Sequence, residues 1–184
     1  SSIAIPRSIA IPRAMVSRTL PAGNMRPMAM IDGVDVGEGL LQAVPFARTL
    51  GVRFDEVVAD DAGGVRAVAR LPDADELHNH VGGPHAGALF TLGETASGAV
   101  VLAAFGHLLD RAVPLAVRAE IDYERLAMGE VRATARLGRP AAEVAAELAA
   151  GIRPEFPVSV EITKADGEVT TRMTVVWTLR PTNR

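Results

Sequence analysis

One long apolar segment limits what this chain can fold into. Between His85 and Gly106 the only side chain that is charged at neutral pH is Glu94. A helix that is apolar all round is buried inside a protein or crosses a membrane, and this segment is long enough to cross. A glutamate at the centre of a bilayer costs about 3 kcal/mol, however, and segments with the alternation of soluble strands lie on both sides. We therefore expect a central helix enclosed by a sheet, and no membrane partner.

Small residues recur along this helix and favour close packing against it. They are Gly87, Ala88, Gly93, Ala96 and Gly98. Just before the helix, Gly82-Gly83-Pro84 provides a turn and a proline that suits a helix start. The backbones of a sheet and of a partner can therefore approach the helix closely.

Segments with a period of two flank the helix and predict strands. The clearest is 115–124, where Leu115, Val117, Ala119, Ile121 and Tyr123 face one way and charged residues face the other. Other strands are expected over 52–60, 65–71, 131–137, 157–163 and 169–179, with turns at 61–64 and at Asp166-Gly167. Short helices are expected over 37–50 and 141–150. This order predicts an α+β domain with an antiparallel sheet.

The start of the chain differs from the rest. Residues 1–31 hold four arginines, four prolines and no acidic residue, and residues 2–7 repeat as 8–13. A basic, acid-free start resembles a transit peptide, but the prolines prevent the amphipathic helix that such peptides need. We expect a poorly structured tail over 1–36 and one domain over 37–182.

Composition excludes several functions. The 19 basic and 22 acidic residues give a net charge of -3, and aromatic residues make up only 4%. Neither an electrostatic surface for nucleic acid nor a stacking platform for single strands is indicated. The chain has no cysteine, which excludes disulfides, thiolate metal sites and a cysteine nucleophile. We expect a cytoplasmic protein.

Glu94 is the residue that most needs an explanation. A charged carboxylate in an apolar helix is costly unless it is paired or hydrogen-bonded, or unless its pKa rises. One interpretation is structural, with Glu94 held by Thr91, Thr95 or a subunit partner. The other is functional, with Glu94 as a general base or nucleophile in a partly dry cleft.

Other chemistries have weaker support. His78, His80 and His85 could join Glu94 in a metal site, but the intervening loop contains two glycines and a proline, and no second carboxylate is near in sequence. We therefore expect no metal. Ser97 lacks the nucleophile elbow of a serine hydrolase.

Three strand arginines could contact phosphates or simply face solvent. They are Arg118, Arg132 and Arg136.

The residues around the helix start resemble a known signature. Residues 79–88 read Asn-His-Val-Gly-Gly-Pro-His-Ala-Gly-Ala, and residues 92–96 read Leu-Gly-Glu-Thr-Ala. This pattern is similar to that of hotdog-fold acyl-CoA thioesterases of the phenylacetate-pathway type, in which an asparagine, a His-Gly-Gly and an acidic residue are spaced as Asn79, His85 and Glu94 are here. The resemblance covers residues 38–180. Two departures, Ala86 in place of a glycine and the helix over 141–150, make the chain most similar to a less characterised branch.

The resemblance implies a curved antiparallel sheet wrapped around the central helix, and a homodimer joined at sheet edges that can pair into a tetramer. It also implies hydrolysis of acyl-CoA or acyl-carrier thioesters at a site between subunits, with no cofactor beyond the coenzyme A of the substrate. Glu94 would be the general base or nucleophile and the Gly87 N–H the oxyanion donor. Asn79 would orient the water or carboxylate, and His85 would hold the loop and the helix start.

Two other functions fit the same fold. The protein could bind acyl groups without cleaving them, with Glu94 as a polar anchor and Ala86 as a sign of relaxed catalytic demand. A dehydratase of this fold pairs a histidine with an acidic residue on the helix, but His85 and Glu94 are nine residues apart and do not share a face in the simplest way.

Overall fold

The structure is a computed structural model that describes residues 33–60 and 63–182, so nearly all of the predicted tail over 1–36 lies outside the described residues. In place of one helix over 37–50 there are two, α1 (Gly33–Ala43) and α2 (Pro45–Thr49). The break falls at Val44, with φ −119° and ψ 83°. A residue that precedes proline is disfavoured in helical conformations, which explains why the apolar periodicity does not produce a continuous helix.

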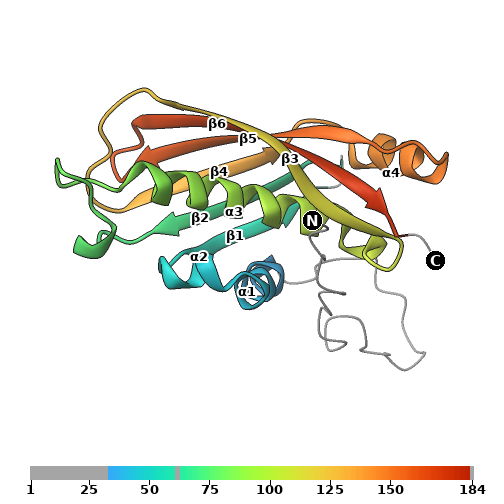
Figure 1. The fold of residues 1–184 in the computed structure, drawn as a ribbon, viewed down its shortest axis with the longest axis horizontal. Helices are drawn as coiled ribbons and strands as arrows, with labels where there is room; N and C mark the ends of the chain where they lie inside the picture. The colour runs from blue at the N-terminus through green and yellow to red at the C-terminus, as the bar shows by residue number, and fades with distance from the viewer. Residues whose placement is uncertain (1–32, 61–62, 183–184) are drawn as a thin grey trace, which may run out of the picture. The chain divides into compact units, whose positions relative to one another are not determined.

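The sheet has six strands in the order β1-β2-β4-β5-β6-β3, and every neighbouring pair is antiparallel (Figure 1). The strands are β1 (Arg53–Ala59), β2 (Val65–Leu71), β3 (Ala112–Tyr123), β4 (Val131–Leu137), β5 (Glu155–Lys164) and β6 (Val169–Pro181). A short helix, α4 (Ala141–Ala149), joins β4 to β5. The predicted α+β class, the expected strands and the short helix are confirmed.

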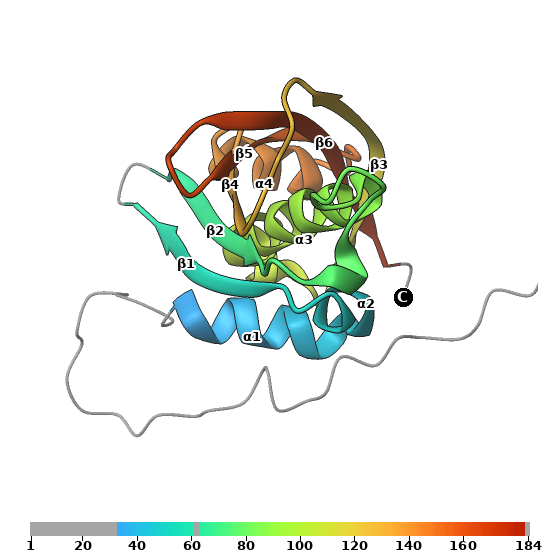
Figure 2. The same cartoon turned by 90° about the vertical axis from the view of Figure 1, so that its left-hand side faces the viewer.

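The central helix, α3, spans Ala86–Phe105 and continues into a single turn, η3 (Gly106–Leu108). Figure 2 shows the sheet curving around α3, with α1 closing the side next to β1. By length and composition alone, Ala86–Leu108 could cross a membrane, but 67% of its apolar window is buried inside the fold. The all-round apolarity of α3 is thus explained by the sheet and α1, which cover it from several sides.

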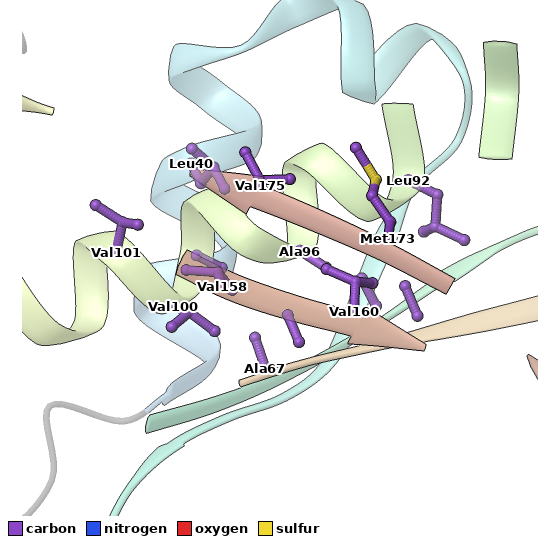
Figure 3. Close-up of a cluster of buried hydrophobic side chains, with 14 of the residues drawn as sticks. Leu40, Ala67, Leu92, Ala96, Val100, Val101, Val158, Val160, Met173 and Val175 are labelled. Atoms are coloured by element: carbon purple, nitrogen blue, oxygen red, sulfur yellow. The ribbon is translucent and has the colours of Figure 1, made fainter. Parts of the chain in front are cut away.

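Small residues let the sheet approach α3, as expected from the sequence. A Cβ on Gly93 would lie only 2.7 Å from Met173 Sδ, with Val160 also in contact range. Ala96, Val160 and Met173 lie together in this part of the core (Figure 3). The absence of a Cβ at position 93 therefore leaves room for the Met173 side chain against α3.

The apolar face of the edge strand β3 is only partly covered. Of the residues that the alternation places on this face, Leu115, Val117 and Tyr123 are 38%, 45% and 48% exposed. A bulge between Ala116 and Arg118 interrupts the alternation, and β3 pairs only with β6 in the described sheet. Ala119 and Ile121 do pack against the core. The alternation marks a strand correctly, but part of its apolar face is not covered within one chain.

Candidate functional site

The segment that leads into α3 is a compact loop. After a turn of 3-10 helix, η2 (Asp75–Leu77), the His85 N–H donates to the Leu77 carbonyl at 2.7 Å. Inside this closure the Asn79 N–H donates to the Gly83 carbonyl at 2.7 Å. The loop is therefore held by its own main chain and delivers the chain to the start of α3 at a fixed place.

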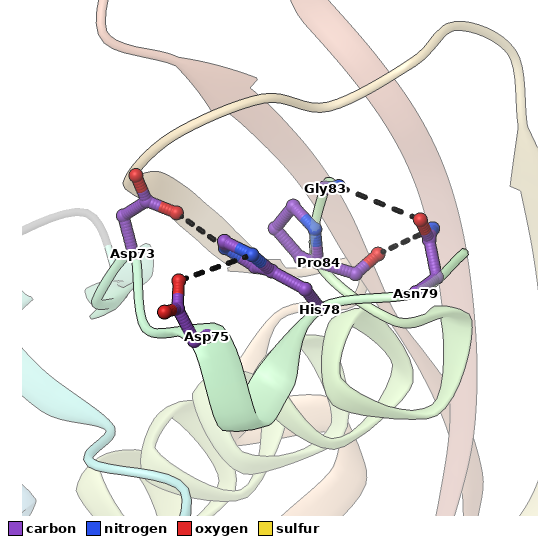
Figure 4. A network of polar contacts seen from close by, with 6 residues as sticks. All are labelled: Asp73, Asp75, His78, Asn79, Gly83 and Pro84. Carbon is purple, nitrogen blue, oxygen red and sulfur yellow. Dashed lines mark hydrogen bonds and ion pairs between the residues drawn. The ribbon is translucent and has the colours of Figure 1, made fainter. Parts of the chain in front are cut away.

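Asn79 braces this loop with its side chain, as Figure 4 shows. Its Oδ1 accepts hydrogen bonds from the Val81 N–H at 2.9 Å and the Gly83 N–H at 3.4 Å. Its Nδ2 donates to the Pro84 carbonyl at 3.3 Å. In this structure the amide orients backbone groups of the loop that precedes the helix.

The two adjacent glycines of the loop serve different purposes. Gly82 has φ +81°, a backbone conformation that residues other than glycine rarely adopt, and nothing lies within 4 Å of a Cβ placed there. A Cβ on Gly83 would lie 2.2 Å from the Ala127 carbonyl oxygen. The Gly83 backbone is therefore pressed against the segment that joins β3 to β4, a packing reason that the sequence did not reveal.

His85 caps α3. Its ring is exposed, and its Nδ1 accepts a hydrogen bond from the Gly87 N–H at 2.9 Å. Because Nδ1 is the acceptor, a neutral His85 carries its proton on Nε2. The Gly87 N–H, the expected oxyanion donor, is thus bonded to the His85 ring in this structure.

The other two loop histidines, His78 and His80, differ in their surroundings. His78 Nε2 lies 2.6 Å from Asp73 Oδ1, and His78 Nδ1 lies 3.7 Å from Asp75 Oδ1 (Figure 4). His80 is exposed. Among the residues that the structure describes, no group of three or more histidine, aspartate or glutamate side chains is arranged to hold a metal ion.

Glu94 lies on the one face of α3 that solvent reaches near the helix start. Gly87 and Phe90 are exposed, and Thr91 and Glu94 are half-buried, whereas the positions between Thr91 and Glu94 are buried. These spacings of three, one and three residues follow a single helical face. From Gly87 to Glu94 the helix makes two turns, which places their Cα atoms about 10 Å apart along the axis.

Burial raises the pKa of the Glu94 carboxyl, and desolvation is the cause. Neither threonine considered as a holder bonds to it: the Thr91 hydroxyl donates to the Gly87 carbonyl at 2.9 Å, and the buried Thr95 hydroxyl has no hydrogen-bond partner in the described part of the chain. No ion pair of a described residue reaches Glu94 either. Within the described chain, the Glu94 carboxyl is thus desolvated without compensation.

The backbone of Glu94 is anchored to the sheet. The buried Ser97 hydroxyl donates to the Glu94 carbonyl at 2.7 Å and accepts from the Trp177 indole N–H at 3.0 Å. Trp177 lies on β6 with Met173 and Val175 and is buried like them. This link fixes the turn of α3 that carries the carboxyl.

Tyr123, at the end of β3, is a site residue that the sequence analysis missed. Its hydroxyl donates to the Ala86 carbonyl at 3.0 Å, in the first turn of α3. Partial burial raises the pKa of Tyr123. The contact joins residues 37 positions apart, so no local pattern points to it; the one available signal is that Tyr123 is the only tyrosine in the chain.

The arginines considered for phosphate binding lie on β3 and β4. Arg132 pairs with Asp55 at 3.7 Å and with Glu130 at 3.6 Å, and Arg118 lies 4.0 Å from Glu120. Arg136 is exposed.

A cavity of about 230 Å³ is lined by Gly51, Arg53, Arg70, Pro72 and Glu130. None of the predicted site residues lines it.

Comparisons with known proteins identify the fold. A family model described as "Domain of unknown function (DUF4442)" matches residues 36–179, whereas no curated protein matches the chain. A protein of unknown function from Pseudomonas aeruginosa, described as a probable thioesterase, is 28% identical with a TM-score of 0.69, and the match covers 80% of this chain and 94% of that one.

Two further solved structures are similar to this chain in fold. A thioesterase family protein from Silicibacter pomeroyi is 19% identical with a TM-score of 0.63, covering 82% of this chain and 99% of its own. A conserved protein from Pseudomonas aeruginosa is 27% identical with a TM-score of 0.55, covering 73% and 92%. The predicted hotdog fold of the thioesterase superfamily is confirmed.

Proposed function

The chain belongs to the family described as a domain of unknown function, DUF4442, and we propose that it is a cytoplasmic hydrolase of acyl-CoA or acyl-carrier thioesters. The observation that carries the proposal is Glu94. Its carboxyl is half-buried, its pKa is raised, and no described residue pairs with it. A desolvated carboxylate on an accessible helix face is costly for folding and useful for catalysis.

Glu94 acts on the thioester as a general base through water, or directly as a nucleophile. A raised pKa brings the carboxyl closer to the working pH, where a base is both deprotonated and strong enough to take a proton. The Ser97–Trp177 link fixes the turn from which the carboxyl projects. General-base catalysis of this kind contributes about 10²–10⁴-fold in rate.

The oxyanion that forms on the thioester accepts a hydrogen bond from the Gly87 N–H. This donor lies in the first turn of α3, where the helix dipole favours negative charge. In the free protein the His85 ring accepts that bond at 2.9 Å. Substrate therefore exchanges one acceptor for another, and the exposed His85 ring has room to turn away. Asn79 keeps the loop in place while this happens.

The acyl group lies along the accessible face of α3. Phe90, 36% exposed, lies about one turn after Gly87 on this face and offers an apolar contact next to the proposed oxyanion donor. Ala86 adds a methyl group at the helix start, where the related signature has glycine, and narrows the approach of the thioester carbonyl.

The active unit is a homodimer joined at β3, and two such dimers can form a tetramer. Leu115 and Val117 are exposed on β3, which pairs only with β6 in the described sheet. Within one chain the Cα atoms of Gly87 and Glu94 are about 10 Å apart along the helix axis, so a thioester oxygen bonded to the Gly87 N–H lies about two helix turns from Glu94 of the same chain. We therefore expect Glu94 of the partner subunit to face the helix start.

One observation favours a second candidate, an acyl-binding module without turnover. The Gly87 N–H already has a partner in His85, so the donor is not open for an oxyanion in the free protein. In this case Glu94 would anchor a polar group of the ligand. Binding of acyl-CoA without release of its thiol would distinguish this function from hydrolysis.

The proposal is tested by free-thiol release from short, long and aromatic acyl-CoAs and from acyl-carrier thioesters. The chain has no cysteine, so the protein contributes no thiol of its own. Release from one class of substrate supports hydrolysis and identifies the acyl group. Binding of acyl-CoA by a folded protein that releases no thiol from any substrate would support the binding module.

A further inference from the structure

One peptide group at the start of α3 is hydrogen-bonded at both ends. The Tyr123 hydroxyl donates to the Ala86 carbonyl at 3.0 Å. The N–H of the same peptide group is that of Gly87, and it donates to His85 Nδ1 at 2.9 Å. The hydroxyl of an edge strand is therefore connected, through a single planar peptide, to the N–H that serves as oxyanion donor in the proposed function.

Hydrogen bonds in such a chain strengthen each other. A donor on the carbonyl oxygen draws electron density from the amide nitrogen, which makes the N–H a better donor, and this cooperativity amounts to about 10–30% per bond. Burial raises the pKa of Tyr123, so its hydroxyl keeps its proton, and remains a donor, through neutral pH.

We propose that Tyr123 is a positioning residue that polarises the Ala86–Gly87 peptide and so strengthens the Gly87 N–H as oxyanion donor. The inference rests on the proposed thioester hydrolysis. Tyr123 need not contact the substrate, because it acts through the peptide. It also ties the end of β3 to the first turn of α3 across 37 positions, which holds the donor in a fixed direction.

The variant Tyr123→Phe removes the hydroxyl and keeps the ring. An oxyanion donor is worth about 10²–10³-fold in kcat, so losing 10–30% of its strength lowers kcat about two- to eightfold. Because the oxyanion forms only in the transition state, KM stays at the wild-type value. A rise in KM that accompanies the loss of kcat would overturn the inference in favour of a structural role.

Thr182→Val is the matched control. The Thr182 hydroxyl also donates to a main-chain carbonyl far away in sequence, that of Asp110 at 3.4 Å, in the segment between η3 and β3. Removal of the Thr182 hydroxyl is expected to leave kcat unchanged. The comparison therefore shows whether losing a hydrogen bond to a distant main-chain carbonyl is enough to lower kcat, or whether the bond to the Ala86 carbonyl is needed.

A second readout needs no substrate. The amide nitrogen of a peptide is deshielded when its carbonyl accepts a hydrogen bond, so the Gly87 amide resonance of ¹⁵N-labelled protein shifts to lower frequency in Tyr123→Phe. A resonance that does not move overturns the inference. If Tyr123→Phe turns over as fast as wild type, the inference alone is overturned. If the wild type shows no turnover, the proposed function is overturned and the inference with it.

Discussion

Glu94 is the only charged residue of α3, and its partial burial raises its pKa without a described partner that would offset the cost. The folded protein therefore binds the Glu94 proton more tightly than the unfolded chain does. The resulting cost is absent below about pH 4.5, the ordinary pKa of the group. It grows as the pH rises from there through the raised pKa of the folded state, and it is complete above that value.

Glu94→Gln is expected to remove this cost. The variant unfolds at the same temperature as wild type below about pH 4.5, and at a higher temperature than wild type once the pH exceeds the raised pKa. Thermal unfolding from pH 4 to 8 measures the difference, with the exposed Glu38 of α1, changed to Gln, as control. A difference between Glu94→Gln and wild type that does not vary with pH would contradict the desolvation of Glu94.

Individual residues of the site differ in how far the sequence reveals them. The spacing of Asn79, His85 and Glu94 is visible because all three lie on one loop and the helix that follows it. Tyr123 is not, because its bond to Ala86 exists only after β3 and α3 have packed. The hydrogen bond from the Gly87 N–H to the His85 ring depends on the side-chain rotamer of His85, which the spacing of residues does not determine.

At the scale of elements, the loop before α3 depends on the segment between β3 and β4. Gly83 is pressed against the Ala127 carbonyl, and Tyr123 comes just before that segment. A displacement of Ala127 should therefore also disturb the bond from Tyr123 to the helix start.

Gly83→Ala is expected to lower both stability and kcat. Its Cβ would lie 2.2 Å from a backbone oxygen, so the two segments must separate. Gly82→Ala is the control: it costs about 1–2 kcal/mol of stability through its left-handed backbone, but its Cβ meets nothing within 4 Å. Chemical unfolding and steady-state kinetics of both variants provide the comparison. Equal losses of kcat in the two would argue against a role for the Ala127 contact.

Most elements could be predicted because their patterns are local. The alternation in β2 and β4 and the Asp166-Gly167 turn follow from neighbouring residues alone. The single helix expected over 37–50 was wrong because Pro45 restricts Val44. The exposure of β3 could not be predicted, because it depends on the position of the strand at the edge of the sheet.

At the scale of the whole molecule, the apolar side chains of β3 need a cover. Val117→Lys places a charge on this edge and is expected to prevent strand pairing between copies. The mass in solution should fall from twice the 19.3 kDa of the chain to that of a single chain, and turnover should be lost with it. Light scattering after size-exclusion chromatography measures the mass.

The opposite edge of the sheet supplies the control for this prediction. Val58 on β1 is 41% exposed, close to the 45% of Val117. Val58→Lys is expected to stay dimeric and active. A dimer that survives Val117→Lys, or one that Val58→Lys disrupts equally, would show that the chains do not join at β3.

Glu94 is the group on which the proposed hydrolysis of a thioester depends, and thiol release by Glu94→Gln, measured beside wild type, tests this role. We expect the variant to fold and to lose about 10²–10⁴-fold in kcat, while Glu38→Gln keeps the wild-type rate. A folded Glu94→Gln protein that turns over as fast as wild type would contradict this role of Glu94.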